Sequence, residues 1–289
     1  MKKFLGALAL LLALPSLANS SDCDAEQQQC VAVGQWQVGV AVGAGVISNP
    51  LHQGENIPLV VVPYLSYYGE QLFFDNGTLG YTLVNKPRFD FSLITTFNAE
   101  QAYFEKFHPN NIFLQKTFLD SSAQLPGGES TVMANAISLQ QIAKRKWAAD
   151  GGVLMHWLLN NQVKVSASWL SDITNTYQGY LAEVALSYRF ALSGKASAAL
   201  KAGVQWKSQA LIDYYYGIDG KDTANASFWY DGKASLQPYL SFAYSYALSE
   251  QWQFKFNAKY KRLDSAMTNS PLVTDDYTAT VFVGGKYEF

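Results

Sequence analysis

Hydrophobic and polar residues alternate one by one along most of the chain. In the segment 251–261, the residues at even positions are apolar and those at odd positions are Gln, Lys or Asn. The apolar set is Trp252, Phe254, Phe256, Ala258 and Tyr260. Because successive side chains of a β-strand point to opposite faces, this period of two predicts a strand with one apolar and one polar face.

The same alternation recurs and predicts twelve strands. Each full-length segment has about ten residues, which is the length of a tilted strand that crosses a bilayer. The predicted strands are 34–46, 57–68, 70–76, 78–84, 87–97, 147–158, 162–171, 179–190, 195–207, 233–247, 251–263 and 278–289. Ten strands is the alternative, because 70–76 and 78–84 are short for a membrane crossing.

The connections between these strands alternate in length. Short turns follow every second strand, as at Asn160-Asn161 and Ser249-Glu250. Most of the other connections are long, namely 47–56, 98–146, 208–232 and 264–277. Outer-membrane barrels have short periplasmic turns and longer extracellular loops. The fold class predicted is therefore all-β, a transmembrane antiparallel β-barrel with both termini in the periplasm.

Composition separates this prediction from its alternatives. The chain is 49% hydrophobic but only 15% charged, with a mean hydropathy of -0.04. A soluble β-sandwich or lipocalin-like barrel also alternates, but its outward face would be charged. Beyond the first ~20 residues no apolar run reaches the ~20 that a membrane helix needs. The 15% of aromatic residues argues against disorder, and a net charge of -2 offers no basic surface for nucleic acid.

The N-terminal residues resemble an export signal. Two lysines precede an apolar run that ends in small residues, which predicts a signal peptide over 1–18. A periplasmic segment over 19–33 and the barrel over 34–289 would follow. Cys23 and Cys30 then lie in a compartment that permits disulfides, so a bridge between them is predicted, with free thiols as the alternative.

The predicted inward face collects more positive than negative charge. A locally cationic lumen would make any pore favour anions. The alternative is that many of these cations sit at strand ends and reach into bulk water. The candidate lumen cations are Lys164, Arg189, Lys201, Lys207, Lys255, Lys259 and Lys261.

Candidate chemistry is sparse. The three histidines are not at metal-ligand spacing, and no cysteine accompanies them. His156 is predicted to be an ordinary polar residue of the lumen wall. Asp275 and Asp276 are predicted to be solvated loop charges. We therefore predict no catalytic residue, no cofactor and no metal site, which makes the protein non-enzymatic.

The longest loop, 98–146, exceeds what a compact domain usually tolerates without a purpose. It contains the apolar and basic run 133–146, which could form a short helix or extend a strand. The loop could fold over the barrel mouth or into it, and the sequence leaves both open.

An ordered set of short motifs carries a family resemblance over essentially the whole mature chain. The motifs are Trp36–Gly45, Val62-Pro63-Tyr64, Tyr214-Tyr215-Tyr216-Gly217, Asn269-Ser270-Pro271-Leu272-Val273 and Gly284-Gly285-Lys286-Tyr287-Glu288-Phe289. With these motifs the sequence resembles the MltA-interacting protein family, the MipA/OmpV outer-membrane proteins. In the final strand, Gly284, Tyr287 and Phe289 look like the signal read by the barrel-assembly machinery.

The resemblance implies a function that no spacing shows by itself. It implies a non-enzymatic barrel in the outer membrane of a Gram-negative bacterium. Its partners would be outer-membrane lipid, the barrel-assembly machinery, a murein lytic transglycosylase and a murein synthase, and it would link the two enzymes as a scaffold in peptidoglycan remodelling. The alternative is a channel, or a surface adhesin that acts through the long extracellular loops.

Overall fold

The computed structural model describes residues 33–113, 137, 139–192 and 194–289. The predicted signal peptide, the periplasmic segment up to residue 32 and the two cysteines therefore lie outside the described residues. No helix within the described residues is both long and apolar enough to cross a membrane.

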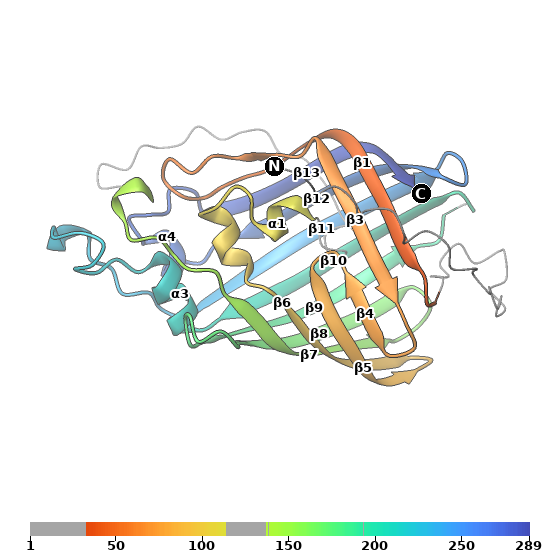
Figure 1. The fold of residues 1–289 in the computed structure, drawn as a ribbon, viewed down its shortest axis with the longest axis horizontal. Coiled ribbons are helices and arrows are strands. Elements are labelled where there is room, and N and C mark those ends of the chain that lie inside the picture. The colour runs from red at the N-terminus through yellow and green to blue at the C-terminus, as the bar shows by residue number, and fades with distance from the viewer. Residues whose placement is uncertain (1–32, 114–136, 138, 193) are drawn as a thin grey trace, which may run out of the picture. The chain divides into compact units, whose positions relative to one another are not determined.

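Twelve antiparallel strands form a closed barrel, which confirms the predicted fold class and strand number (Figure 1). Each strand pairs with its neighbour in the sequence, and β13 pairs with β1. The short strand β2 (Ile57–Pro58) extends the sheet beside the end of β1 and is not counted in the twelve. The barrel strands are β1 (Trp36–Ile47), β3 (Val61–Tyr68), β4 (Leu72–Asp75), β5 (Thr78–Lys86), β6 (Phe89–Phe97), β7 (Ala149–Leu158), β8 (Val163–Asp172), β9 (Tyr180–Phe190), β10 (Ala196–Lys207), β11 (Ser235–Ala247), β12 (Trp252–Arg262) and β13 (Tyr277–Glu288).

Among the residues that the structure describes, helical segments lie only in the loops. They are η1 (Ala99–Tyr103), α1 (Pro109–Ile112), η2 (Leu139–Gln141), α3 (Gln209–Tyr216), η3 (Ala226–Phe228) and α4 (Ser265–Thr268). The predicted choice between helix and strand for 133–146 resolves, within the described residues, to the single turn η2. The long connections all lie at one end of the barrel. From the length rule for outer-membrane barrels, we call this the extracellular end and the opposite end, which has only short turns, the periplasmic end.

The seam between β1 and β13 closes the barrel through two facing glycines. Gly43 lies directly opposite Gly284 in the register. A Cβ added to Gly43 would overlap the carbonyl oxygen of Val283, and one on Gly284 would overlap that of Val42. Glycine is required here because the two backbones approach too closely for any larger residue.

The two faces of the wall sort as the alternation predicts. On β12, Trp252 is 45% exposed on the lipid face, whereas Asn257 and Lys261 are 3% and 8% exposed toward the interior. Aromatic pairs lie near both ends of the lipid face, for example Trp252 with Tyr287 and Trp169 with Tyr180. Such belts match the two interfaces of a bilayer.

The barrel wall extends less far toward the extracellular end at the hairpin of β4 and β5 than at the neighbouring strands. The hairpin of β4 and β5 turns at Asn76-Gly77, whose φ angles of 46° and 94° suit a tight turn that Asn-Gly favours. On one side of β4, β3 continues to Val61, and on the other side β6 continues to Phe97. β4 itself pairs with β3 over Ser66–Tyr68, and β5 pairs with β6 up to Thr95. The prediction of a short strand is thus confirmed for β4, which has four residues, but not for β5, which has nine residues, as many as β6.

Candidate functional site

The extracellular end of the barrel is covered by a packed cap. Five of the six extracellular connections contribute to one apolar cluster, and the exception is the Asn76-Gly77 turn. The buried members are Leu51, Ile137, Ala148, Tyr177, Leu211, Ile212, Tyr215, Tyr216, Ile218, Leu263, Met267, Leu272 and Val273. Burial of this size provides the main stabilisation of a loop region that has little regular structure. We call this cluster the cap.

The segment η1–α1 enters the mouth of the barrel just after β6. Asn98 begins η1, because its side chain accepts a hydrogen bond from the backbone N–H of Glu100 at 3.0 Å. The Asn98 amide also donates to Asp150 of β7 at 2.7 Å, which ties the start of η1 to the wall. Asn111 of α1 donates to the carbonyl of Ala102 at 2.8 Å and so folds α1 back on η1. The long loop therefore folds into the mouth over its described residues.

Helix α3 forms the opposite side of the cap. Ser208 caps its N-terminus by accepting from the Leu211 N–H at 3.3 Å. Its apolar residues Leu211, Ile212 and Tyr215 are fully buried in the cap. At its C-terminal end the guanidinium of Arg145 donates to the carbonyl of Gly217 and makes a two-point ion pair with Asp222, at 3.0 and 3.1 Å. The far end of the long loop is thereby fixed to α3.

A buried charge cluster joins the cap to the barrel wall. Glu100 of η1 accepts from Lys207 of β10 at 2.6 Å, and the hydroxyl of Tyr216 in α3 donates to the same carboxylate at 2.5 Å. The side chains of Glu100 and Lys207 are only 5% and 1% exposed. Burial alone would raise the pKa of Glu100, but the positive charges of Lys207 and Lys261 outweigh it and hold that pKa below its usual value. Glu100 is therefore an anion whose contacts join η1 to β10 and α3.

A second cluster lies deeper in the lumen on β9–β12. Glu183 accepts from Lys201 at 3.1 Å and from the hydroxyl of Tyr239 at 2.7 Å. Gln205 donates to the other oxygen of the same carboxylate at 2.7 Å. The ammonium of Lys259 lies 4.4 Å from the centre of the Tyr239 ring. These contacts gather two lysines around one carboxylate.

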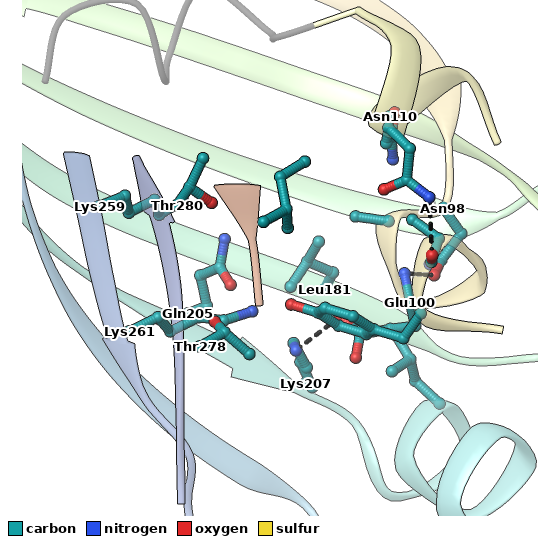
Figure 2. A pocket seen from close by; sticks show the side chains of 16 residues that line it. Asn98, Glu100, Asn110, Leu181, Gln205, Lys207, Lys259, Lys261, Thr278 and Thr280 are labelled. Atoms are coloured by element: carbon teal, nitrogen blue, oxygen red, sulfur yellow. Dashed lines mark hydrogen bonds and ion pairs between the residues drawn. The ribbon is translucent and has the colours of Figure 1, made fainter. Parts of the chain in front are cut away.

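A cavity lies between the cap and the strand wall (Figure 2). The cavity volume is about 90 Å³, and part of the cavity is open to solvent. Figure 2 shows Lys259, Lys261, Thr278, Thr280 and Gln205 on the strands at one side, with Asn98, Glu100 and Asn110 of the loop segment at the other. The cavity is therefore lined by charged and polar groups on two sides.

The candidate lumen cations divide into two groups. Lys201, Lys207, Lys259 and Lys261 gather around the cavity and the two carboxylates. Lys164, Arg189 and Lys255 lie on β8, β9 and β12 toward the periplasmic ends of those strands. The sequence analysis missed Glu100, because its ion pair joins residues 107 positions apart and no local pattern signals it.

The other predicted positions have plain structural settings. His156 contacts Asp90 of the neighbouring strand at 3.0 Å, in a half-exposed position. Asp275 and Asp276 lie in the loop before β13. Tyr287 packs against Trp252 on the lipid face, and Phe289 at the strand's end is exposed. Among the described residues, no group of three or more His, Cys, Asp or Glu side chains could hold a metal ion.

The chain resembles known outer-membrane proteins over most of its length. A MltA-interacting protein of Escherichia coli (strain K12) is 25% identical over 261 residues, which cover 90% of this chain and 93% of the relative. The putative outer membrane protein YiaT of the same strain is 23% identical over 253 residues, covering 86% and 91%. The outer membrane protein OmpV of Vibrio cholerae serotype O1 is 27% identical over 139 residues, covering 48% and 53%.

The family assignment follows from a longer match. Residues 42–289, which include nearly the whole barrel, match the family described as MltA-interacting protein MipA. The similar proteins are named outer membrane proteins, and the closed barrel has an apolar face toward lipid, so the chain is an outer-membrane barrel. The chain belongs to the MltA-interacting protein MipA family.

Proposed function

We propose that this protein is a non-enzymatic scaffold that holds a murein lytic transglycosylase and a murein synthase at the inner surface of the outer membrane. The observation that carries the proposal is the match over residues 42–289, together with a relative of nearly equal length whose name states that it interacts with MltA. A scaffold of this kind needs a rigid frame and a surface that faces the peptidoglycan.

The arrangement of the barrel supports this role. The cap fills the extracellular end, where Glu100 and Lys207 pair in a dry environment. The buried carboxylates of the lumen are held by lysines and hydroxyls, which is how structural charges are satisfied. Both features fit a frame better than an open channel. The periplasmic turns, with residues 19–33 before the barrel, are the surface offered to the two enzymes.

The test is co-purification with the full chain in lipid nanodiscs. Purified transglycosylase and synthase are added separately and together, and the retained fraction of each is measured. A triple variant of exposed periplasmic charges, Glu70→Ala, Arg88→Ala and Glu250→Ala, should reduce retention of at least one enzyme by about tenfold. The matched control carries Glu55→Ala, Lys106→Ala and Lys221→Ala at the extracellular end and should retain both.

A variant lacking residues 19–31 completes the experiment. The proposal fails if neither enzyme is retained by the unaltered protein, or if the extracellular variant loses them while both periplasmic variants keep them. The second result would favour the adhesin alternative, for which Phe107 and Trp229 are suited by their exposed fractions of 81% and 54% on extracellular loops.

A further inference from the structure

We propose that the cavity between η1–α1 and the strand wall binds an amphiphilic anion. A carboxylate or phosphate head is held by Lys259 and Lys261, and an apolar part lies along Ile47, Leu181 and Leu211. This site is independent of the scaffold role, because it lies inside the barrel and not on the periplasmic surface.

The charges around the cavity do not balance. Among the described residues that line the cavity, Lys207, Lys259 and Lys261 face one carboxylate, Glu100, and Glu183 lies deeper beside Lys201. Lys201 and Lys207 hold the two carboxylates directly, at 3.1 and 2.6 Å. An unbalanced ammonium out of water costs several kcal/mol, so a bound anion would relieve this cost.

Lys261 shows the imbalance most clearly. It is 8% exposed, and the contact described for its ammonium is the ring face of Tyr103 at 5.8 Å. Within the described residues it makes no ion pair at 4.0 Å or less. Its ammonium therefore has donors left for an oxygen ligand that enters the cavity.

Neutral polar groups complete the site for the head group. Thr278 and Thr280 of β13 and Gln205 of β10 line the same side of the cavity (Figure 2). Thr280 is the register partner of Lys259, and Thr278 is that of Lys261, so each lysine has a hydroxyl beside it. Hydroxyl and ammonium donors side by side suit the several oxygens of a carboxylate or phosphate.

The remaining lining is apolar, which favours an amphiphile over a bare inorganic anion. Ile47, Ala102, Leu181 and Leu211 contribute to it from four different elements or their flanks. Ligand pockets are mostly apolar, with a few polar groups that fix the orientation of the ligand. The cavity has this mixture.

Such a ligand would enter from the membrane at the low side of the wall, between β3 and β6. Between β3 and β6, the strands β4 and β5 end at the Asn76-Gly77 turn, and α1 is drawn near this low part of the wall (Figure 1). Asn110 of α1 donates to the carbonyl of Phe97 at 3.3 Å, and Asn49 donates to the carbonyl of Tyr103 at 2.7 Å, so the segment spans from one side to the other. At the start of β3, Val60 and Val61 are 55% and 61% exposed.

The experiment measures displacement of a fluorescent carboxylate, 11-(dansylamino)undecanoate, from the full chain in zwitterionic nanodiscs, with empty nanodiscs subtracted. Dodecanoate and dodecyl phosphate represent the head and tail together. Dodecanol represents the tail alone, and inorganic phosphate the head alone. We expect both amphiphilic anions to displace the probe at concentrations at least tenfold below those of dodecanol or phosphate.

Two variants test the site itself. Lys259→Gln with Lys261→Gln should weaken probe binding at least tenfold, and Thr280→Trp should abolish it by filling the space while keeping every charge. The matched control is Lys255→Gln, a lumen lysine four residues from Lys259 on the same strand, and it should bind as the unaltered protein does. Resistance of the barrel to unfolding in SDS without heating confirms that each variant is folded.

Three results would overturn the proposal. One is equal displacement by dodecanol and dodecanoate, which would mean simple partition into an apolar space. Another is inorganic phosphate binding as tightly as dodecyl phosphate, which would mean a free anion as ligand. The third is unchanged probe affinity in the folded lysine and tryptophan variants.

Discussion

The two ends of the barrel are built from the same strands but hold their charges differently. At the extracellular end the Glu100–Lys207 pair is 5% and 1% exposed and lies under an apolar cap. At the periplasmic end Lys286 and Glu288 pair at 2.9 Å with 15% and 33% of their side chains exposed, and short turns join the strands. The alternating strands form both ends of the barrel, but only at the extracellular end do packed loops exclude water from the charged side chains.

The contrast shows what a loop adds to a barrel. In the periplasmic half a charged side chain can reach water, so losing its partner costs little. In the extracellular half, a carboxylate from a loop that is as buried as Glu100 must pair with the wall, because so little of it reaches water. The cap should therefore be sensitive to charge changes that the periplasmic end tolerates.

Removing the buried carboxylate of Glu100 should have the largest effect on the stability of the cap. Glu100→Gln leaves Lys207 buried without its anion, and we expect the cap to lose about 3–5 kcal/mol of stability. Hydrogen exchange of residues 209–216, followed by mass spectrometry, measures the loss. Glu288→Gln is the matched change at the other end and should leave that exchange unaltered. Adding Lys207→Met to Glu100→Gln should restore much of the protection; equal, small effects of the two single changes would contradict the account.

An apolar deletion should have the next largest effect. Leu211 is fully buried in the cap, so Leu211→Ala should destabilise it by about 2–5 kcal/mol through lost burial and a cavity. Leu248 is 57% exposed beside a periplasmic turn, and Leu248→Ala should change stability by less than about 0.5 kcal/mol. Thermal unfolding with protease cleavage of the loops as readout compares the two. Similar losses would show that the cap is not a packed core.

Acid should loosen the cap before it affects the strands. Burial lowers the pKa of His108 to about 4, from an ordinary value of 6.5. The unfolded form therefore binds a proton between these values that the folded form excludes, and stability falls as pH drops from 6.5 toward 4. Glu100, whose pKa is also lowered, adds a loss at still lower pH, because its stabilisation is present above its unfolded pKa and disappears as the folded pKa is crossed.

The size of the acid effect is about 2 kcal/mol between pH 6.5 and 5, at 1.36 kcal/mol for each unit. Exchange of residues 99–112 across this range measures it. His108→Asn keeps a residue that can cap α1 and should flatten the pH profile. An unchanged profile in this variant, or a profile already flat in the unaltered protein, would count against the assignment to His108.

The smallest effect should come from an exposed ion pair of the same cap. Lys106 and Glu55 pair at 3.1 Å but are 52% and 78% exposed, so Lys106→Ala should cost about 0.5 kcal/mol. Asp222→Asn, at the two-point pair with Arg145 that is 10% and 4% exposed, should cost more, about 1–3 kcal/mol. A larger loss of stability for Lys106→Ala than for Asp222→Asn would mean that the burial of an ion pair does not determine how much it stabilises the cap.

The strands were predictable because their signal is local. On β12 each apolar residue is followed by a polar one, and because successive side chains point to opposite faces, this order determines which residues face lipid and which face the lumen. The boundaries deviate where the backbone breaks the pattern: the predicted strand 57–68 is split into β2 and β3, which pair with different parts of β1. The sequence contains both glycines of the seam, Gly43 and Gly284. Their close approach could not be predicted, because it depends on the pairing of β1 with β13 that closes the barrel.

The site was only half predictable. Parity placed Lys201, Lys207, Lys259 and Lys261 inside, because each lies on a strand of known phase. Glu100 could not be placed, because η1 and its position in the mouth depend on contacts with Asp150 and Tyr216 far along the chain. A cationic lumen thus follows from the strands, whereas the division into a dry, paired end and a wetter end depends on the loops.

Ion conductance across a planar bilayer tests the packed cap most directly. We expect the unaltered protein to give no stable conductance steps, because the loops fill the extracellular end, and Glu100→Gln or Leu211→Ala to introduce flickering openings. Large, steady conductance from the unaltered protein, unchanged by either substitution, would contradict the claim that the cap closes the barrel.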